Sequence, residues 1–367
     1  MPRVRILHRG LQIQGVELLY CHWNIWAGVR DKSQISGLAA KLVIALKWLI
    51  AMPLLSLRYL FMPRHDLVLV SYPGQFDMPF IRLLTRLRRV PLVWDAFLSL
   101  WDTAILDRKI ARETSITAKA LFRADKLAAH MAGHTILDTN AHARFFKQSF
   151  QLEEGSVSAV PVGAEEAAFP LAPFTEHTAD RSLEVLFYGQ LIPLHGLQTI
   201  LNAVRMLQGE NIHFTIIGDG QERILMEQAV RDEALAPTLT WKPWVSYDRL
   251  QHYIAASDLC LGIFSAGDKA SRVIPNKVYQ TLITGRPIIS RDSPAIHELP
   301  RTILQRITLV PPEDPAALAS AISACVMAPA LPAFSTEERE ALVETAIGRR
   351  ALTVLTKLRN DHGGPHD

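Results

Sequence analysis

Residues 258–290 decide the fold of this chain and read DLCLGIFSAGDKASRVIPNKVYQTLITGRPIIS. The apolar run Leu259–Phe264 has the length of a buried strand, and Pro287–Ile289 marks a second one. Between them, a polar loop at 265–275 leads into a predicted helix at 276–284. This order of strand, loop, helix and strand is typical of a parallel α/β sheet.

The loop in this segment has the features of an anion-binding site. Open α/β sheets bind ligands at the carboxyl ends of their strands, and the free amides of a helix N-terminus favour an anion. Asn276 opens the predicted helix, and Lys269, Arg272 and Lys277 add positive charge around it. The pattern therefore predicts a phosphate-binding site.

Size and composition narrow the possible classes of protein. At 367 residues the chain exceeds what one hydrophobic core usually supports, so we expect two domains. A net charge of +3, without a basic tract interleaved with aromatic residues, argues against nucleic acid as a partner. The three cysteines lack metal-ligand spacing and fit a reducing compartment. We expect a cytoplasmic protein without a signal peptide or a metal site.

The segment Leu38–Met62 is unusually apolar and allows three interpretations. Its length approaches that of a membrane span, but three cations and a proline interrupt it. These residues are Lys41, Lys47, Pro53 and Arg58. A transmembrane helix, an interfacial helix with its cations at the lipid headgroups, and an ordinary buried helix all remain open. Cations beside aromatic rings suit an anionic membrane surface, so the membrane is a candidate partner.

The first half of the chain alternates strands with helices. Strands are predicted at Val4–His8, Leu67–Ser71, Val90–Trp94, Thr135–Asp138 and Val157–Val162. Asp95 follows the third of these, at a sheet edge where loops carry function. A carboxylate there can orient or deprotonate an acceptor hydroxyl, the alternative being an acid that caps a helix or faces solvent. We also expect Asp102, Asp107 and Arg108 to face this region.

The second half repeats the pattern. A strand at Ser182–Tyr188 ends in the turn at Gly189, and a strand at Phe214–Ile217 ends in Gly218-Asp219-Gly220. A Gly-x-Gly turn alone is a weak sign of nucleotide binding, because tight strand-to-helix turns need glycine as well. A third strand at 239–241 precedes Trp244 and Val245, and core packing explains Trp244 alone better than a base-stacking role does.

Two segments resemble retaining glycosyltransferases of family 4. Residues 276–280, Asn-Lys-Val-Tyr-Gln, and 284–289, Thr-Gly-Arg-Pro-Ile-Ile, are similar to the donor-site segment of the subgroup with an Ile-Pro-Asn-Lys motif. The family usually has Glu, seven residues and a second Glu there. Arg272 takes the place of the first Glu, and Gln280 takes the place of the second, which binds ribose.

The turn from Gly189 to Gly196 resembles a second segment of the family. Gly-Arg-x-x-x-x-Lys-Gly holds the donor diphosphate there, whereas this chain has Gln190 and His195 in place of the two cations. Trp244-Val245 resembles the segment that meets the nucleobase through backbone groups. The resemblance therefore implies the following donor-binding residues: Gly189, Gln190, His195, Gly218, Trp244, Val245, Asn276 and Gln280.

The resemblance implies a GT-B architecture, in which two Rossmann-like βα domains face each other across a cleft. Residues 1–175 would hold the acceptor, 176–340 would bind the nucleotide-sugar, and 341–367 would form a helix that crosses back to the first domain, followed by a disordered tail. The implied activity is retaining transfer of a hexose from a UDP- or GDP-linked sugar to a hydroxyl. Arg272 and Lys277 would stabilise the leaving diphosphate.

Two further expectations and two alternatives complete this interpretation. The transfer needs neither a cofactor nor a metal, since no Asp-x-Asp signature occurs in a suitable place. Leu38–Met62 and Asp95 together predict a lipid-linked saccharide or polysaccharide precursor as acceptor, at the cytoplasmic membrane face. Positions 190, 195, 272 and 280 differ from the family, so a catalytically inactive nucleotide-sugar-binding subunit remains an alternative. A phosphorylase or epimerase of the same fold is another.

Overall fold

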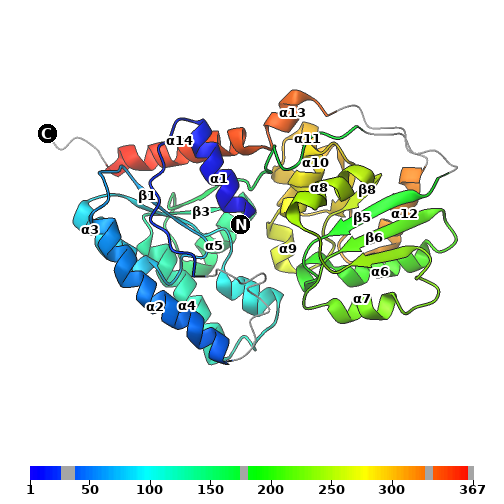
Figure 1. Cartoon of the computed structure of the whole chain (residues 1–367), viewed down its shortest axis with the longest axis horizontal. Helices are drawn as coiled ribbons and strands as arrows, with labels where there is room; N and C mark the ends of the chain where they lie inside the picture. The colour runs from blue at the N-terminus through cyan, green and yellow to red at the C-terminus, as the bar shows by residue number, and fades with distance from the viewer. Residues whose placement is uncertain (26–37, 174–180, 327–333, 363–367) are drawn as a thin grey trace.

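The computed structural model describes residues 1–25, 38–173, 181–326 and 334–362. Two parallel sheets lie side by side, each with its own helices (Figure 1). The predicted domain boundary at residue 175 and the tail beyond residue 362 lie outside the described residues. The fold is α/β, as the sequence predicted.

The first sheet has four strands in the order β1-β2-β3-β4. Its strands are β1 (Val68–Ser71), β2 (Leu92–Asp95), β3 (His134–Leu137) and β4 (Val157–Ala159). The helices of this half are α1 (Pro2–Ile13), α2 (Leu38–Leu60), α3 (Met78–Arg88), the π-helix η2 (Asp102–Asp107), α4 (Ile116–Met131) and α5 (Asn140–Phe150). We call this half the N-terminal domain.

The second sheet has six strands in the order β10-β9-β8-β5-β6-β7. Its strands are β5 (Leu183–Tyr188), β6 (Ile212–Ile217), β7 (Leu239–Lys242), β8 (Leu259–Leu261), β9 (Ile288–Arg291) and β10 (Ile307–Val310). The chain leaves β5 in one direction and returns to β8 on its other side. Strand order therefore reverses between β5 and β8, and ligands of doubly wound sheets bind at such a point.

Helices cover both faces of the second sheet, which belongs to the half that we call the C-terminal domain. They are η3 (Pro193–His195), α6 (Leu197–Met206), α7 (Arg223–Ala229), α8 (Tyr247–Ala256), α9 (Asp268–Arg272), α10 (Asn276–Ile283), η4 (Ile296–Glu298), α11 (Arg301–Leu304) and α12 (Pro315–Val326). Leu183, Val185 and Phe187 of β5 pack towards α6, α7 and α12, whereas Leu186 and Tyr188 pack towards α8 and α10. This alternation is expected for a strand that is buried on both faces.

The prediction of a first strand at Val4–His8 is wrong, because these residues belong to α1. Pro2 suits the first turn of a helix, and Ile6, Leu7 and Leu11 are buried on one side of it. That side packs on α14 (Glu344–His362), where a Cβ on Gly10 would lie 2.8 Å from the Cα of Gly348. The local spacing of these residues is that of a helix, and the partner that covers its apolar side lies at the other end of the sequence.

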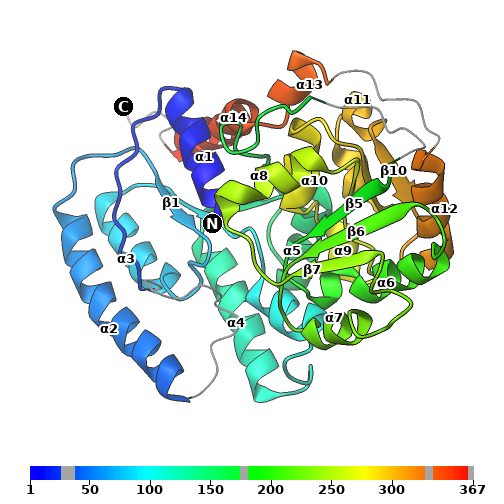
Figure 2. The same cartoon turned by 45° about the vertical axis from the view of Figure 1, so that its right-hand side comes forward.

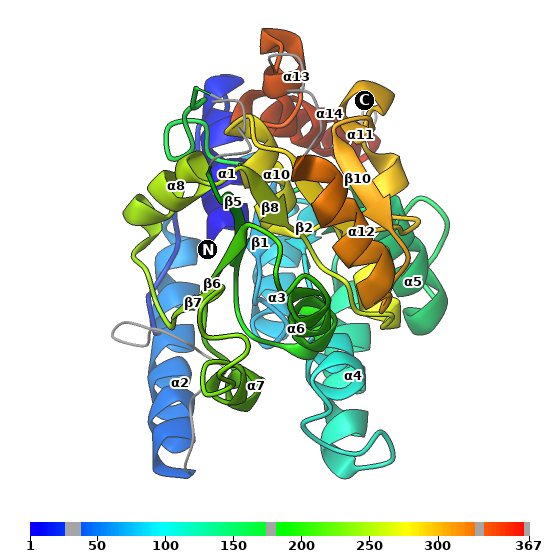
Figure 3. The same cartoon turned by 90° about the vertical axis from the view of Figure 1, so that its right-hand side faces the viewer.

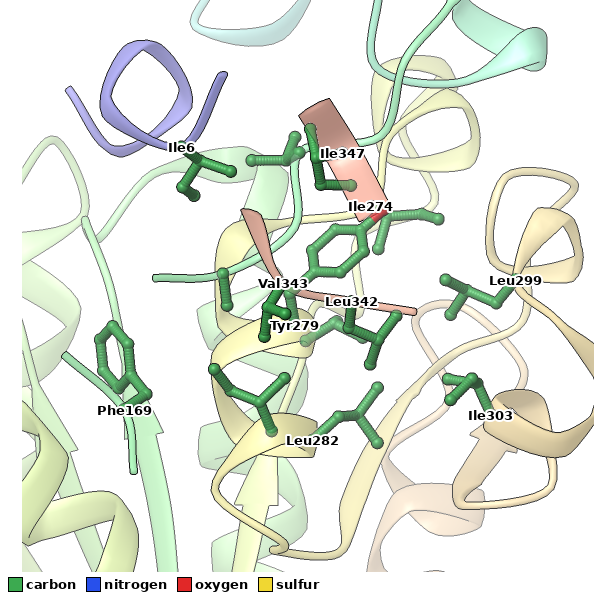
Figure 4. Packing of buried hydrophobic residues seen from close by; sticks show 14 of the residues in the cluster. Ile6, Phe169, Ile274, Tyr279, Leu282, Leu299, Ile303, Leu342, Val343 and Ile347 are labelled. Atoms are coloured by element: carbon green, nitrogen blue, oxygen red, sulfur yellow. The ribbon is translucent and has the colours of Figure 1, made fainter. Parts of the chain in front are cut away.

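A continuous apolar core joins the two halves of the molecule. Tyr279 of α10 is buried, and its neighbours come from both domains and from the connection to α14. Figure 4 shows Tyr279 together with Ile274, Leu342, Val343 and Ile347. The short helix α13 (Thr336–Glu340), with a capping box at Ser335 and Glu338, leads into this connection. The helix that carries Lys277 is therefore fixed against both domains.

The helix predicted within Leu38–Met62 is present as α2, but it is not an ordinary buried helix. Only 17% of the stretch from Leu42 to Leu60 is buried. Among the residues that the structure describes, α2 is the one helix long and apolar enough to cross a membrane. Figure 3 shows it along the outer edge of the N-terminal domain. The buried-helix interpretation is therefore wrong.

Candidate functional site

The loops that follow β5 and β8 meet at the point where strand order reverses. The Phe264 amide donates to the His195 carbonyl over 3.1 Å. A Cβ on Gly189 would lie 2.9 Å from His195 Cε1 and 3.2 Å from Lys277 Nζ, and Gly189 has a φ of 145°. A larger residue would collide with both side chains. The structure thus brings two of the predicted site residues, His195 and Lys277, against the predicted glycine Gly189.

Lys277 and His195 are both buried beside this glycine. Lys277 Nζ lies 3.7 Å from the centre of the Phe187 ring and 3.3 Å from the Gly262 carbonyl, to which it donates. Burial lowers the pKa of Lys277 well below its usual value. Burial, and then Lys277, lower the pKa of His195 in the same way. Its neutral imidazole donates from Nδ1 to the Gln190 carbonyl. An anion entering this site would therefore restore the charge of Lys277.

Gln280 lies one turn further along α10 and is held on two sides. Its Oε1 accepts from the Tyr188 hydroxyl over 3.3 Å, and its Nε2 donates to the Tyr247 hydroxyl over 3.4 Å. The Tyr247 hydroxyl in turn donates to Glu165 over 2.5 Å, and Arg5 of α1 holds Glu165 at 2.6 and 2.7 Å. This chain of contacts ties the predicted ribose contact to the N-terminal domain.

The pKa shifts of Tyr247 and Glu165 agree with this series of hydrogen bonds. Burial, and then the hydrogen bond to Glu165, raise the pKa of Tyr247, so its hydroxyl keeps its proton. Burial alone would raise the pKa of Glu165, but the hydrogen bonds from Arg5 and Tyr247 outweigh it and lower the pKa. Glu165 is therefore an anion that accepts from both neighbours. Sequence reasoning missed Arg5, Glu165 and Tyr247, because no local pattern links them.

Two cations of the β8 loop contact η2 of the N-terminal domain. Arg272 Nη2 lies 2.8 Å from Asp102 Oδ1, and its guanidinium lies 3.7 Å from the centre of the Phe145 ring. Lys269 Nζ donates to Thr103 Oγ1 over 2.5 Å. Asp102 is fully buried, and its second oxygen has no hydrogen-bond partner. Arg272 therefore lies between the two domains, in the segment that leads into α10.

Arg108 supplies a charge that the β5 loop itself lacks. Its Nη2 donates to Gln190 Oε1 over 3.1 Å, and its carbonyl accepts from Gln221 over 3.0 Å. Gln190 is thus joined to a permanent cation from the opposite domain. Asp102 and Arg108, expected beside Asp95, contact the loops of the C-terminal domain instead, and the sequence gave no sign of the pairing between Arg108 and Gln190.

Asp95 has a different environment from the one expected. It is the last residue of β2 rather than the first residue of a loop, and its side chain is fully buried. Arg3 Nη2 lies 2.8 Å from Asp95 Oδ1, while Arg3 Nη1 donates over 2.7 Å to the Val160 and Pro161 carbonyls. Asp95 therefore binds α1 to the sheet. Arg3 was missed because the first residues were interpreted as a strand.

The remaining predicted donor residues lie around the same sheet edge. A Cβ on Gly218 would lie 1.8 Å from the Gly189 carbonyl oxygen, so the turns after β5 and β6 touch only because Gly218 is small. Asn276 is the first residue of α10 and is half-buried. Val245 packs partly against the core, whereas Trp244 exposes 69% of its surface, which excludes core packing as its role.

Two Rossmann-like domains joined by a returning C-terminal helix, with glycine turns and buried basic side chains at the switch point of the second sheet, are the features of the GT-B fold. Residues 182–327 match the family model described as Glycosyl transferases group 1. The match covers the C-terminal domain, and the fold of the whole chain is GT-B.

Solved structures with the same fold include the following three. Sucrose-phosphate synthase from Thermosynechococcus elongatus is 16% identical over 91% of this chain and 80% of its own, with a TM-score of 0.61. The lipopolysaccharide outer core galactosyltransferase WaaB in its apo form is 12% identical over 97% and 95%, with a TM-score of 0.60. HepE of Anabaena with UDP and glucose is 15% identical over 91% and 85%, with a TM-score of 0.57. No curated protein matches the sequence.

Proposed function

We propose that this protein is a retaining glycosyltransferase of family 4. It transfers a hexose from a UDP- or GDP-linked sugar to a hydroxyl of a lipid-linked saccharide or polysaccharide precursor. The observation that carries the proposal is the convergence of Gly189, His195 and Lys277 at the switch point of the second sheet. HepE structures with UDP and with UDP-glucose support a nucleotide-sugar as the donor.

Different residues of the site bind different parts of the nucleotide-sugar. Lys277 and the N-terminal amides of α10, which begins at Asn276, take the diphosphate, with Arg272 beside them. Gln280 contacts the ribose, and the Trp244-Val245 segment borders the nucleobase. These cations and amides can stabilise the charge that develops on the diphosphate, so the proposed reaction needs no metal.

Retention fixes the geometry of the transfer step. The bond between the anomeric carbon and the phosphate oxygen breaks, and the acceptor oxygen bonds to the same carbon from the same face. The acceptor proton passes to the released diphosphate, whose oxygen lies on that face. Asp95 is not required as the base in this scheme, which agrees with its buried pairing to Arg3.

The test is turnover by the purified full chain. Nucleotide-sugars linked to UDP and GDP are supplied with glycolipid acceptors, and product configuration is read by NMR. Lys277→Met should lower turnover at least 100-fold, because preorganised charge on a developing anion is worth about two to three orders of magnitude in rate. Lys126→Met, on the surface of α4, is the matched control and should leave turnover unchanged.

The inactive-subunit alternative has one observation in its favour. His195 and Lys277 are both shifted towards their neutral forms by burial, and Gln190 and Gln280 carry no charge. Binding of UDP without turnover of any nucleotide-sugar would support this alternative. Release of free sugar phosphate or of an epimerised donor would instead indicate a phosphorylase or an epimerase.

A further inference from the structure

The outer face of α2 exposes a continuous row of large apolar side chains. Leu46, Leu49 and Leu57 expose 58%, 59% and 55% of their surfaces, and Phe61, just after the helix, exposes 80%. The other exposed members of the row are Leu42, Val43, Ile50, Leu54 and Leu60. They recur at intervals of three and four residues, so they form one face of the helix. Soluble surfaces rarely leave an apolar face of this extent in water.

The opposite face of α2 is fastened to the N-terminal domain. Met52 and Tyr59 are buried, and Trp48 Nε1 donates to Asp77 Oδ1 over 2.7 Å. Arg88 of α3 donates to the carbonyls of Tyr59 and Met62 over 2.8 and 2.7 Å. The helix is held along its length against α3. A transmembrane orientation would break these contacts, whereas an orientation in the plane of a membrane surface keeps them.

Two neighbouring segments extend this face. Leu83 and Leu87 of α3 expose 62% and 67% of their surfaces. Tyr20 and Trp23 are half-exposed beside α2, where the Tyr20 carbonyl accepts from Arg58 Nη2 over 3.1 Å. Aromatic rings with one polar edge are typical of the boundary between lipid and water. We call α2, α3, Tyr20 and Trp23 the α2 surface.

The charge on the α2 surface has one sign. The sequences of α2 and α3 contain six Lys and Arg and no Asp or Glu. Lys47 and Arg58 flank the apolar row, and their long side chains can place the apolar stem in lipid and the charge at the headgroups. An anionic bilayer matches both properties. A second copy of the chain would place cations against cations.

We propose that the α2 surface docks this protein on an anionic lipid bilayer, with α2 lying in the plane of the interface. Figures 1 and 2 show α2 at the edge of the molecule away from the C-terminal domain, so docking leaves that domain in water. The docking does not depend on the proposed glycosyl transfer. If that transfer holds, it keeps the N-terminal domain beside an acceptor that remains in the membrane.

The test is sedimentation of the full chain with vesicles of phosphatidylcholine, with or without phosphatidylglycerol. We expect binding to the vesicles with phosphatidylglycerol, at least 10-fold weaker binding to phosphatidylcholine alone, and loss on raising salt. Leu46→Ser, Leu49→Ser and Leu57→Ser combined should weaken binding at least 10-fold. Ile110→Ser, Ile116→Ser and Ile224→Ser combined remove exposed apolar residues elsewhere and should leave binding unchanged.

Several results would overturn the proposal. One is a wild-type chain that stays in the supernatant, and another is an α2 triple variant that binds vesicles like the wild type. Dimerisation in lipid-free solution that the α2 triple variant abolishes would assign the surface to a second copy. Retention in the membrane after alkaline carbonate would assign α2 to a span. UDP binding by each variant shows that it is folded, and separates a failure of docking from a failure of the proposed function.

Discussion

Asp102 and Arg272 form an ion pair between the two domains, with Arg272 Nη2 2.8 Å from Asp102 Oδ1. Asp102 is fully buried, and Phe145 covers the guanidinium from the other side. Arg272 is therefore already neutralised by a carboxylate in the protein without nucleotide. A donor diphosphate that uses this cation must compete with Asp102, so donor binding and the contact between the domains are linked.

This competition predicts opposite effects for the two partners. Arg272→Ala should weaken UDP binding by about 1.5–3 kcal/mol, the scale of a charge-assisted hydrogen bond. Asp102→Asn should tighten it, because Arg272 is released for the phosphates. Isothermal titration calorimetry measures both, and Asp232→Asn, at a partly exposed ion pair of the C-terminal domain, is the control. Equal losses of affinity in both variants would mean that the pair only holds the fold together.

The lowered pKa of Lys277 leads us to expect that the protein takes up a proton when it binds UDP. Burial holds the pKa of Lys277 well below its usual value, and the phosphates of UDP should raise it. Between the two pKa values the bound form carries about one proton more than the free form, so affinity falls as pH rises. Titrations in buffers of different ionisation enthalpy count this proton. His195→Asn should retain the uptake and Lys277→Met should abolish it; identical wild-type enthalpies in all buffers would contradict the prediction.

Gln280 predicts how the protein distinguishes ribose from deoxyribose. If its side chain meets the ribose hydroxyls, Gln280→Leu should bind UDP and 2′-deoxy-UDP almost equally, whereas the wild type prefers UDP. Tyr247→Phe should lose part of this preference, because the Tyr247 hydroxyl holds Gln280 Nε2. Competition binding gives the ratio for each variant. Gln280→Glu should preserve the preference, and equal losses for both nucleotides in Gln280→Leu would indicate structural damage.

The lowered pKa of His134 leads us to expect that the folded protein loses stability in acid. Its Nε2 contacts Ser158 Oγ at 2.8 Å, and burial lowers its pKa to about 4. The unfolded chain takes up this proton near pH 6.5, before the folded protein does, so stability is lost as pH falls from about 6.5 to 4. The difference corresponds to about 3 kcal/mol. Urea unfolding at several pH values should show a smaller loss for His134→Gln than for the wild type or for His252→Gln, an exposed control on α8.

Local sequence patterns correctly predicted the elements whose structure depends on residues close together in the chain. The strand, loop and helix at 258–290 are present as β8, α9 and α10, although β8 ends at Leu261 and α9 was not predicted. Gly189 and Gly218 were identified from their turns, and both are sites where a side chain would collide with a neighbour. Short-range patterns of apolar residues and glycines therefore predicted the second sheet and the loops at its edge.

Local sequence patterns could not predict contacts between residues that are far apart in the chain. Val4–His8 was predicted as a strand from its short apolar run, and α14, which covers the apolar side of α1, lies far away in sequence. Asp95 looked like a loop carboxylate because nothing near it in sequence indicates Arg3. The pairing of Gln190 with Arg108 likewise crosses between the domains. The apolar composition of α2 did not reveal which face is covered, and only the packing on α3 decides that.

The close approach of Gly10 to Gly348 has a consequence for how the protein is made. During synthesis α1 emerges well before α14, so its apolar residues Ile6, Leu7 and Leu11 have to wait for the helix that covers them. Residues 181–326 carry the whole second sheet and its helices, and they leave the ribosome before that partner exists. The N-terminal domain is therefore complete only after α14 has been made, which is later than the second sheet.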